Sequence, residues 1–195
     1  MGESYAGKFV LAIRYHILKV NAYLPASKRV NLAGVAIGNG LTDPVNQVST
    51  HATNAYYSGL INERQRDELK KLQREAINLA KMGKWREATN ARSHVLTMLQ
   101  RMTGLATLHD FSKKDHPYET EMVFDFLRKG DMKKALGVKH DDFMKSVKFM
   151  VEFLVKRSKV LLYEGHLDMR DSVVSTEAWV NGKPTIGVPV LRGAG

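Results

Sequence analysis

The sequence predicts an α/β protein that combines a parallel sheet with a large helical block. Two short apolar segments, residues 31–38 and 159–163, are typical of strands buried on both faces of a parallel sheet. Between them, from residue 45 to about 158, the apolar residues follow helical spacing. We therefore expect a core segment over residues 1–44, a helical insertion over 45–158, and the remainder of the core with an irregular tail over 159–195.

The chain opens with a serine among small residues, in the run Met1-Gly2-Glu3-Ser4-Tyr5-Ala6-Gly7. An apolar stretch of helical character follows at once, which is the pattern of a strained strand-to-helix turn that exposes a nucleophile. Ser4 is then the candidate nucleophile, and the backbone N–H of Tyr5 lies where it can face a developing oxyanion. The match to G-x-S-x-G is imperfect, so a flexible N-terminus with an ordinary N-cap serine stays an alternative.

The elements that follow the turn are predicted from periodicity and chain breakers. Apolar residues at helical spacing predict a helix over residues 7–24, which Pro25 ends. The strand within residues 31–38 comes next. Residues 39–44 then form a turn at its carboxyl end, where open α/β sheets place ligand-binding loops.

The helical block contains several distinct helices. Asn62 and Gln65 form the pattern of a capping box, and the helix that they begin runs to Gly83. A second helix follows over residues 84–103, so the two are expected to pair as a hairpin. Further helices are predicted over about 119–129, 131–136 and 142–157.

The carboxyl-terminal part returns to the sheet. The strand over residues 159–163 leads into a loop at its carboxyl end, Glu164–Asp168. A helix is expected from Val173, with Ser175 or Thr176 as its cap.

Composition narrows the function classes. Cysteine is absent, which excludes a disulfide framework, a cysteine nucleophile and a thiolate metal site, and no metal or other cofactor is expected. No apolar run reaches the roughly 20 residues that span a bilayer, and no signal-peptide pattern precedes the serine turn. The net charge of +10 is spread over several helices and mixed with acidic residues, so nucleic acid is not an expected partner.

Four separated segments resemble the serine carboxypeptidases, a branch of the α/β-hydrolases. The segments are residues 2–7, 32–44, 133–138 and 160–180. In the helical block, runs of residues such as Tyr56-Tyr57-Ser58-Gly59-Leu60 resemble the plant serine-carboxypeptidase-like subgroup. The resemblance implies a partial α/β-hydrolase sheet with the insertion acting as a lid over the active site. Relative to that family, the chain is expected to be truncated at both ends.

The resemblance also implies roles for individual residues. Ser4 would be the nucleophile, and Tyr5 would donate one oxyanion N–H. Glu3 would help bind the free carboxylate of a peptide, an arrangement that needs a shared proton. Asp168 would orient the catalytic histidine.

The histidine of this triad has no counterpart at its expected place. In the family it lies well downstream of the aspartate, whereas no histidine follows Asp168 here. His166 lies two residues before Asp168, and a residue on the same loop seldom reaches both the carboxylate and a remote serine. We therefore expect the isolated chain to be inactive or nearly so, because serine without a base is a weak nucleophile.

Three functions stay open on sequence grounds. The first is release of the C-terminal residue of peptides through an acyl-serine intermediate. The second is transfer of an acyl group to a small acceptor by the same residues. The third is a non-catalytic basic helical module that binds a partner, as the +10 charge would allow. The family implies a secreted or vacuolar location, and the oligomeric state is not indicated.

Overall fold

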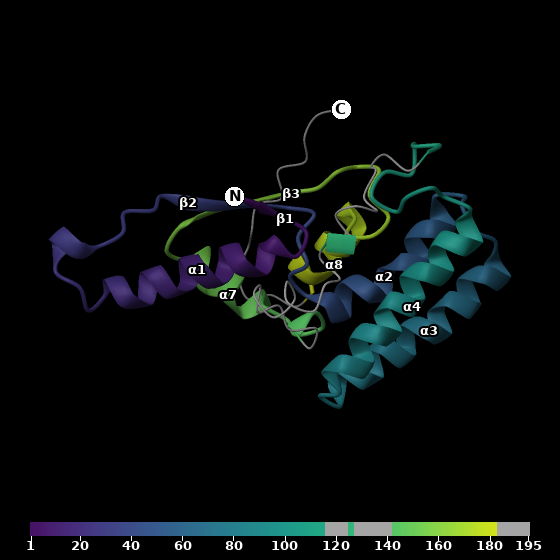
Figure 1. Cartoon of the computed structure of the whole chain (residues 1–195), viewed down its shortest axis with the longest axis horizontal. Coiled ribbons are helices and arrows are strands. Elements are labelled where there is room, and N and C mark those ends of the chain that lie inside the picture. The colour runs from purple at the N-terminus through teal and green to yellow at the C-terminus, as the bar shows by residue number, and fades with distance from the viewer. Residues whose placement is uncertain (116–124, 127–141, 183–195) are drawn as a thin grey trace.

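The computed structural model describes residues 1–115, 125–126 and 142–182. A parallel sheet occupies one end of the molecule and a group of longer helices the other (Figure 1). In chain order the elements are β1 (Gly2–Glu3), α1 (Ala6–Asn21), a 3-10 turn (Ala26–Lys28), β2 (Gly34–Gly38), α2 (Pro44–Tyr57), α3 (Glu63–Lys81), α4 (Trp85–Thr103), α7 (Lys148–Leu154), β3 (Lys159–Tyr163) and α8 (Val173–Val180).

The described sheet has the strand order β1-β2-β3, and both pairs of strands are parallel. Gly2 pairs with Ile37, and the register of β2 on β3 runs from Gly34 opposite Lys159 to Gly38 opposite Tyr163. The carboxyl ends of all three strands therefore meet at one edge of the sheet. The two strands predicted from the apolar segments are confirmed as β2 and β3.

Helices α1 and α7 cover one face of the sheet. Buried residues of these two helices, of β2 and of α8 form one hydrophobic cluster. We call it the sheet cluster: Leu11, Val35, Ile37, Val151, Leu154 and Trp179. On the other face, Leu161 is 56% exposed and Tyr163 is 38% exposed. The prediction that both faces are buried is therefore wrong for the described part of the chain, because its helices lie against one face only.

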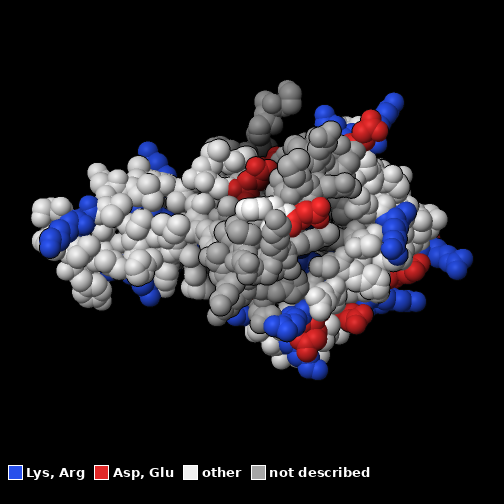
Figure 2. Space-filling model, viewed as in Figure 1, with Lys and Arg blue, Asp and Glu red and all other residues white. Residues whose placement is uncertain are grey.

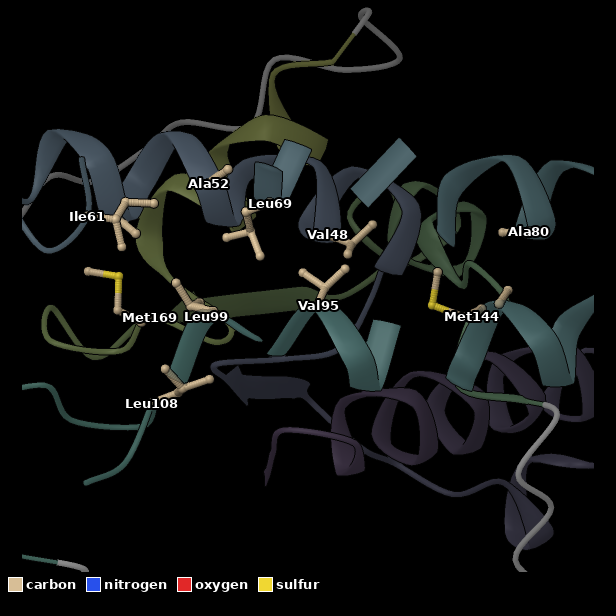
Figure 3. Packing of buried hydrophobic residues seen from close by; sticks show 12 residues of the cluster. Val48, Ala52, Ile61, Leu69, Ala80, Val95, Leu99, Leu108, Met144 and Met169 are labelled. Carbon is tan, nitrogen blue, oxygen red and sulfur yellow. The ribbon is translucent and has the colours of Figure 1, made fainter. Parts of the chain in front are cut away.

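The hairpin of α3 and α4 packs on α2 and forms a second core (Figure 3). We call its buried residues the helical cluster: Val48, Ala52, Ala55, Ile61, Leu69, Ala80, Ala88, Val95, Leu99, Leu108, Met144 and Met169. The predicted capping box is present, since Asn62 Oδ1 accepts from Gln65 N at 2.9 Å and Gln65 Oε1 accepts from Asn62 N at 2.9 Å. Gly83, with φ of 73°, turns the chain between the two helices as predicted.

Several predicted boundaries differ from the structure. The helix predicted over residues 142–157 is confined to α7, and the residues before it form turns. The cap of α8 is Ser172, whose hydroxyl accepts from Ser175 N at 3.2 Å, so the prediction of Ser175 or Thr176 as the cap is wrong. The helices predicted over 119–129 and 131–136 lie outside the described residues, apart from 125–126.

Charge is dispersed over the surface. On the face drawn in Figure 2, basic side chains are separated by uncharged surface and interspersed with acidic ones. Among the described residues, no helix has both the length and the apolar character that a membrane crossing would require.

Candidate active site

Ser4 occupies a strained turn between β1 and α1. Its φ is 54°, a left-handed conformation that costs a non-glycine residue roughly 1–2 kcal/mol. Three backbone hydrogen bonds of 3.0 Å hold it: Ser4 N donates to Gly38 O, and the carbonyl of Ser4 accepts from Gly7 N and Leu41 N. The predicted strand-turn-helix geometry is therefore present.

The glycines around Ser4 are explained by the close approach of neighbouring atoms. A Cβ on Gly2 would lie 2.7 Å from Val10 Cγ2 and 3.0 Å from Ala6 Cβ, so the neighbouring residues would have to shift. A Cβ on Gly7 would lie 3.0 Å from Ile37 Cγ2 and 3.3 Å from Gly40 Cα. Gly7 is thus what lets the first turn of α1 approach β2 and the loop after it.

Tyr5 and Glu3 flank the serine on either side. Tyr5 is the N-cap residue of α1, and N–H groups at a helix N-terminus have no partner within the helix. The ring of Tyr5 stacks on Phe143 with centroids 4.5 Å apart. Glu3 ends β1 and is exposed, so its carboxylate faces solvent next to the serine.

Lys8 fastens a distant segment beside this turn. Its ammonium donates to the carbonyl of Asp142 at 2.8 Å and to that of Lys145. Burial lowers the pKa of Lys8 to about 8, partly offset by the carboxylate of Asp142. Val147 N also donates to Thr42 O at 2.9 Å, so residues 142–147 are held against both the serine turn and the loop after β2.

Asp168 lies in the loop after β3 and is buried. One carboxylate oxygen, Oδ1, accepts from Arg170 N at 2.6 Å and Asp171 N at 2.9 Å, while Oδ2 accepts from Asn39 Nδ2 at 3.0 Å. Burial raises the pKa of Asp168 to about 6, against the lowering effect of the backbone N–H of Asp171. Glu164 lies earlier in the same loop, and burial raises its pKa to about 8 although Thr176 donates a hydrogen bond to it at 2.7 Å.

Ser4 and Asp168 come to the same edge of the sheet through β2. Ser4 follows β1, Asp168 follows β3, and the strand between them ends at Gly38 and Asn39. Gly38 accepts from Ser4 N, and Asn39 donates to Asp168. The structure thus brings the two predicted polar residues together at one edge, linked by adjacent residues.

The five histidines within the described residues take other places. His16, His94, His109 and His166 are exposed. His51 on α2 is buried, and burial together with the charges of Arg92 and Arg170 lowers its pKa to about 3, so it is neutral. His109 Nε2 lies 3.4 Å from Arg170 Nη1. Among the described residues no hydrogen bond joins Ser4 or Asp168 to a histidine.

A buried polar network beside Asp168 was not predicted from the sequence. Asp171 Oδ1 accepts from Gln47 Nε2 at 3.2 Å and lies 3.4 Å from Arg92 Nη2. Gln47 also donates to Gly40 O at 3.0 Å, and its Oε1 accepts from Thr42 N at 2.9 Å. The network joins α2, α4 and the two loops of the site. The only sequence signal near it was the Asn39-Gly40 turn after a buried strand.

The described residues contain no cluster of three or more His, Cys, Asp or Glu side chains arranged to hold a metal ion. The chemistry that the arrangement offers is that of a hydroxyl on a strained turn and a buried carboxylate at one edge of a parallel sheet.

Comparison with known proteins gives a consistent result. A sequence model described as serine carboxypeptidase matches residues 1–188. The chain is 52% identical to serine carboxypeptidase-like 50 of Arabidopsis thaliana, covering 92% of this chain and 43% of the relative. It is 30% identical to the venom serine carboxypeptidase of Apis mellifera, over 92% of this chain and 43% of that protein. The chain thus spans less than half the length of these relatives.

A solved structure has a similar fold. Kex1(Δ)p, a prohormone-processing carboxypeptidase from Saccharomyces cerevisiae, superposes with a TM-score of 0.66 at 18% identity. The match covers 92% of this chain and 46% of that one. This likeness supports an α/β-hydrolase type of fold, as the sequence predicts.

Proposed function

The chain belongs to the serine carboxypeptidase family, and from this premise we propose that its site serves release of the C-terminal residue of a peptide through an acyl-serine intermediate. The single observation that carries the proposal is the conformation of Ser4. A serine with φ of 54° stands between a parallel strand and a helix at the carboxyl edge of the sheet, which is the backbone arrangement that exposes a nucleophile.

The proposed reaction assigns a step to each predicted residue. Ser4 Oγ attacks the carbonyl carbon of the scissile bond, and the backbone N–H of Tyr5 stabilises the oxyanion that forms. The tetrahedral species collapses to an acyl-serine as the C-terminal residue leaves with the proton that a base took from Ser4. Water then hydrolyses the acyl-serine. Asp168 orients the imidazole that moves these protons.

Glu3 is proposed to bind the carboxylate of the substrate. Glu3 is the last residue of β1 and directly precedes Ser4 in the sequence. It is exposed, so a substrate bound at Ser4 can contact its carboxylate. Two carboxylates at close range favour sharing one proton, because both cannot stay charged together. Binding by this route is therefore proposed to weaken as pH rises.

We also propose that the 195-residue chain by itself is inactive or nearly so. Two observations support this. No histidine follows Asp168 in the sequence, and none of the five described histidines forms a hydrogen bond with Ser4 or Asp168. Residues 45–158 are proposed to act as the helical insertion over the site. The hairpin of α3 and α4 and its packing on α2 support that assignment.

The proposal is tested with an N-blocked dipeptide whose scissile bond is an ester, with imidazole added as the base. Slow release of the C-terminal part is expected from the chain, but not from Ser4→Ala. A substrate with an amidated C-terminus should react more slowly, and Glu3→Ala, which removes the group that shares the proton, should remove that difference. Release that is equal for the chain and for Ser4→Ala would refute the proposal. If an added small alcohol captures the acyl group in place of water, the reaction is acyl transfer instead.

A further inference from the structure

Asn39 lies between the two predicted polar residues of the site. It directly follows β2, the strand that separates β1 from β3 in the described sheet. Its φ is 42°, a left-handed conformation that asparagine tolerates better than most residues. Asn39 N donates to Tyr163 O at 3.0 Å, which fixes its backbone at the carboxyl end of β3.

The side-chain amide of Asn39 makes three hydrogen bonds of 3.0 Å to one loop. Nδ2 donates to Asp168 Oδ2 and to the carbonyl of Asp171, and Oδ1 accepts from Gly165 N. Both N–H groups of the amide are thereby used. The amide spans the loop after β3 from its start to its end, and the middle contact is with the carboxylate of Asp168.

The two oxygens of Asp168 are held differently. Oδ1 accepts two backbone N–H groups, from Arg170 and Asp171, which use both of its lone pairs. Oδ2 accepts only the amide of Asn39 among the described residues, so within that part of the chain one of its lone pairs has no donor. An imidazole N–H that Asp168 orients would therefore bind Oδ2, beside Asn39.

We propose that Asn39 is a positioning residue, which fixes Oδ2 of Asp168 and with it the plane of the carboxylate that orients a base. The backbone bonds hold Oδ1, and a carboxylate held at one oxygen can still swing about that point. Asn39 supplies the second fixed point from a rigid strand end. The inference rests on the proposed function only in naming Asp168 as the orienting acid.

The first experiment follows the Asn39 amide directly by NMR on the full chain. The side-chain N–H resonances of Asn39 should shift with pH at the midpoint at which the Asp168 carboxyl carbon titrates. In Asp168→Asn this titration of the amide should disappear. An Asn39 amide that does not titrate with Asp168 would overturn the inference, whether or not the chain has any activity.

The second experiment measures acylation of Ser4 by a fluorophosphonate with imidazole as the base. Asn39→Gly removes the amide while glycine accepts the left-handed backbone, and we expect about a tenfold slower reaction. Asn21→Ala is the matched control. Asn21 also bonds a loop through both ends of its amide, at 2.9 and 3.0 Å to Val30, but at the opposite end of α1 from Ser4. Its rate should equal that of the unchanged chain.

The double variant separates positioning from a structural role. If Asn39 acts through Asp168, then Asn39→Gly causes no further loss in an Asp168→Asn background. Independent, multiplying losses would refute the inference. Should Asn39→Gly fail to fold, Asn39→Asp replaces it. At acid pH the new carboxyl is protonated and can donate a hydrogen bond to Oδ2, so the acylation rate of this variant should approach that of the unchanged chain at the same pH. If no variant is acylated, the proposed function fails, and the amide titration alone decides the inference.

Discussion

Ser4 and Asn39 share a left-handed backbone, and both lie directly after a strand of the sheet. Such strain persists only where surrounding hydrogen bonds determine the conformation. For Ser4 these are the bonds to Gly38, Gly7 and Leu41. The strained backbone keeps Ser4 at the carboxyl edge of the sheet, and the strain costs stability.

The cost can be measured by comparing two replacements of Ser4. Ser4→Gly and Ser4→Ala both remove the hydroxyl, but only glycine adopts φ of 54° without a steric penalty. The free energy of unfolding in urea should be about 1 kcal/mol higher for Ser4→Gly than for Ser4→Ala. Equal stabilities would show that the turn is relaxed in solution.

Glu164 predicts a dependence of stability on pH. Burial raises its pKa to about 8 from the ordinary value of 4.5, so between these values the folded chain keeps a proton that the unfolded chain has lost. The free energy of unfolding therefore falls as pH rises through this range. Asp168, with a pKa of about 6, contributes in the same direction over a narrower range.

Glu164→Gln isolates the contribution of Glu164. At about pH 5 the variant and the unchanged chain should have similar urea midpoints, whereas at about pH 9 the variant should be the more stable of the two. The control is Glu177→Gln, at a carboxylate on α8. Parallel pH profiles for Glu164→Gln and the unchanged chain would contradict the assignment of this shift.

At the scale of elements, α4 is attached to the site through a buried ion pair. The side chains of Arg92 and Asp171 are 4% and 3% exposed, with Nη2 and Oδ1 3.4 Å apart. Removing either partner leaves a buried charge without its counterpart, which typically costs about 3 kcal/mol. Burial also lowers the pKa of Arg92, opposed by the charge of Asp171.

A double-mutant cycle tests this attachment. Arg92→Met and Asp171→Asn should each lower the free energy of unfolding by about 3 kcal/mol, and the double variant should lose much less than the sum of the two. The measurement is equilibrium unfolding in urea. Additive losses would indicate that the two side chains do not interact in solution.

Local signals in the sequence predicted some elements well. The capping box at Asn62 fixed the start of α3 because it depends on residues three positions apart. The end of α3, which falls just before Gly83, was likewise predictable from a local signal. The start of α7 was not predictable, because the preceding residues are held as turns by Lys8, more than a hundred positions away in the sequence.

The candidate site, like the fold, was predicted from the sequence only in part. Ser4 was predicted because it lies in a run of small residues before an apolar helical stretch, and Asp168 because it follows the apolar strand β3. Both runs resemble a known family. Asn39 was predicted only as part of a turn at a ligand-binding edge, without its partner, and Gln47 and Arg92 were not predicted as parts of the site. The partners of all three lie on loops distant in sequence. Nothing in the spacing of these residues marks them as neighbours.

On the scale of the whole molecule, two clusters of buried residues divide the described chain. Helix α7 falls within the predicted insertion by its residue numbers, yet Val151 and Leu154 belong to the sheet cluster. Met144 and Met169 flank the site and belong to the helical cluster. The division into residues 1–44, 45–158 and 159–195 stays a prediction, which the behaviour of α7 can test.

Native-state hydrogen exchange can report this division. Leu11 and Leu69 are both fully buried, one in each cluster, and truncation to alanine should cost about 3 kcal/mol at either position. Leu11→Ala should speed exchange in β2, β3 and α7, and Leu69→Ala in α2, α3 and α4. If each variant speeds exchange uniformly, the two clusters form one cooperative unit.

We propose that Ser4 is a nucleophile at the sheet edge that Asp168 also reaches, and that the 195-residue chain does not by itself supply the base for it. The most direct test is the rate at which a fluorophosphonate acylates Ser4 as a function of imidazole concentration, with the adduct located by peptide mass. We predict a rate near background without imidazole, a rise with its concentration, a smaller rise in Asp168→Asn and no adduct in Ser4→Ala. Rapid acylation without imidazole would show that one of the seven histidines already acts as the base. An unchanged amount of adduct in Ser4→Ala would show that the reactive residue lies elsewhere.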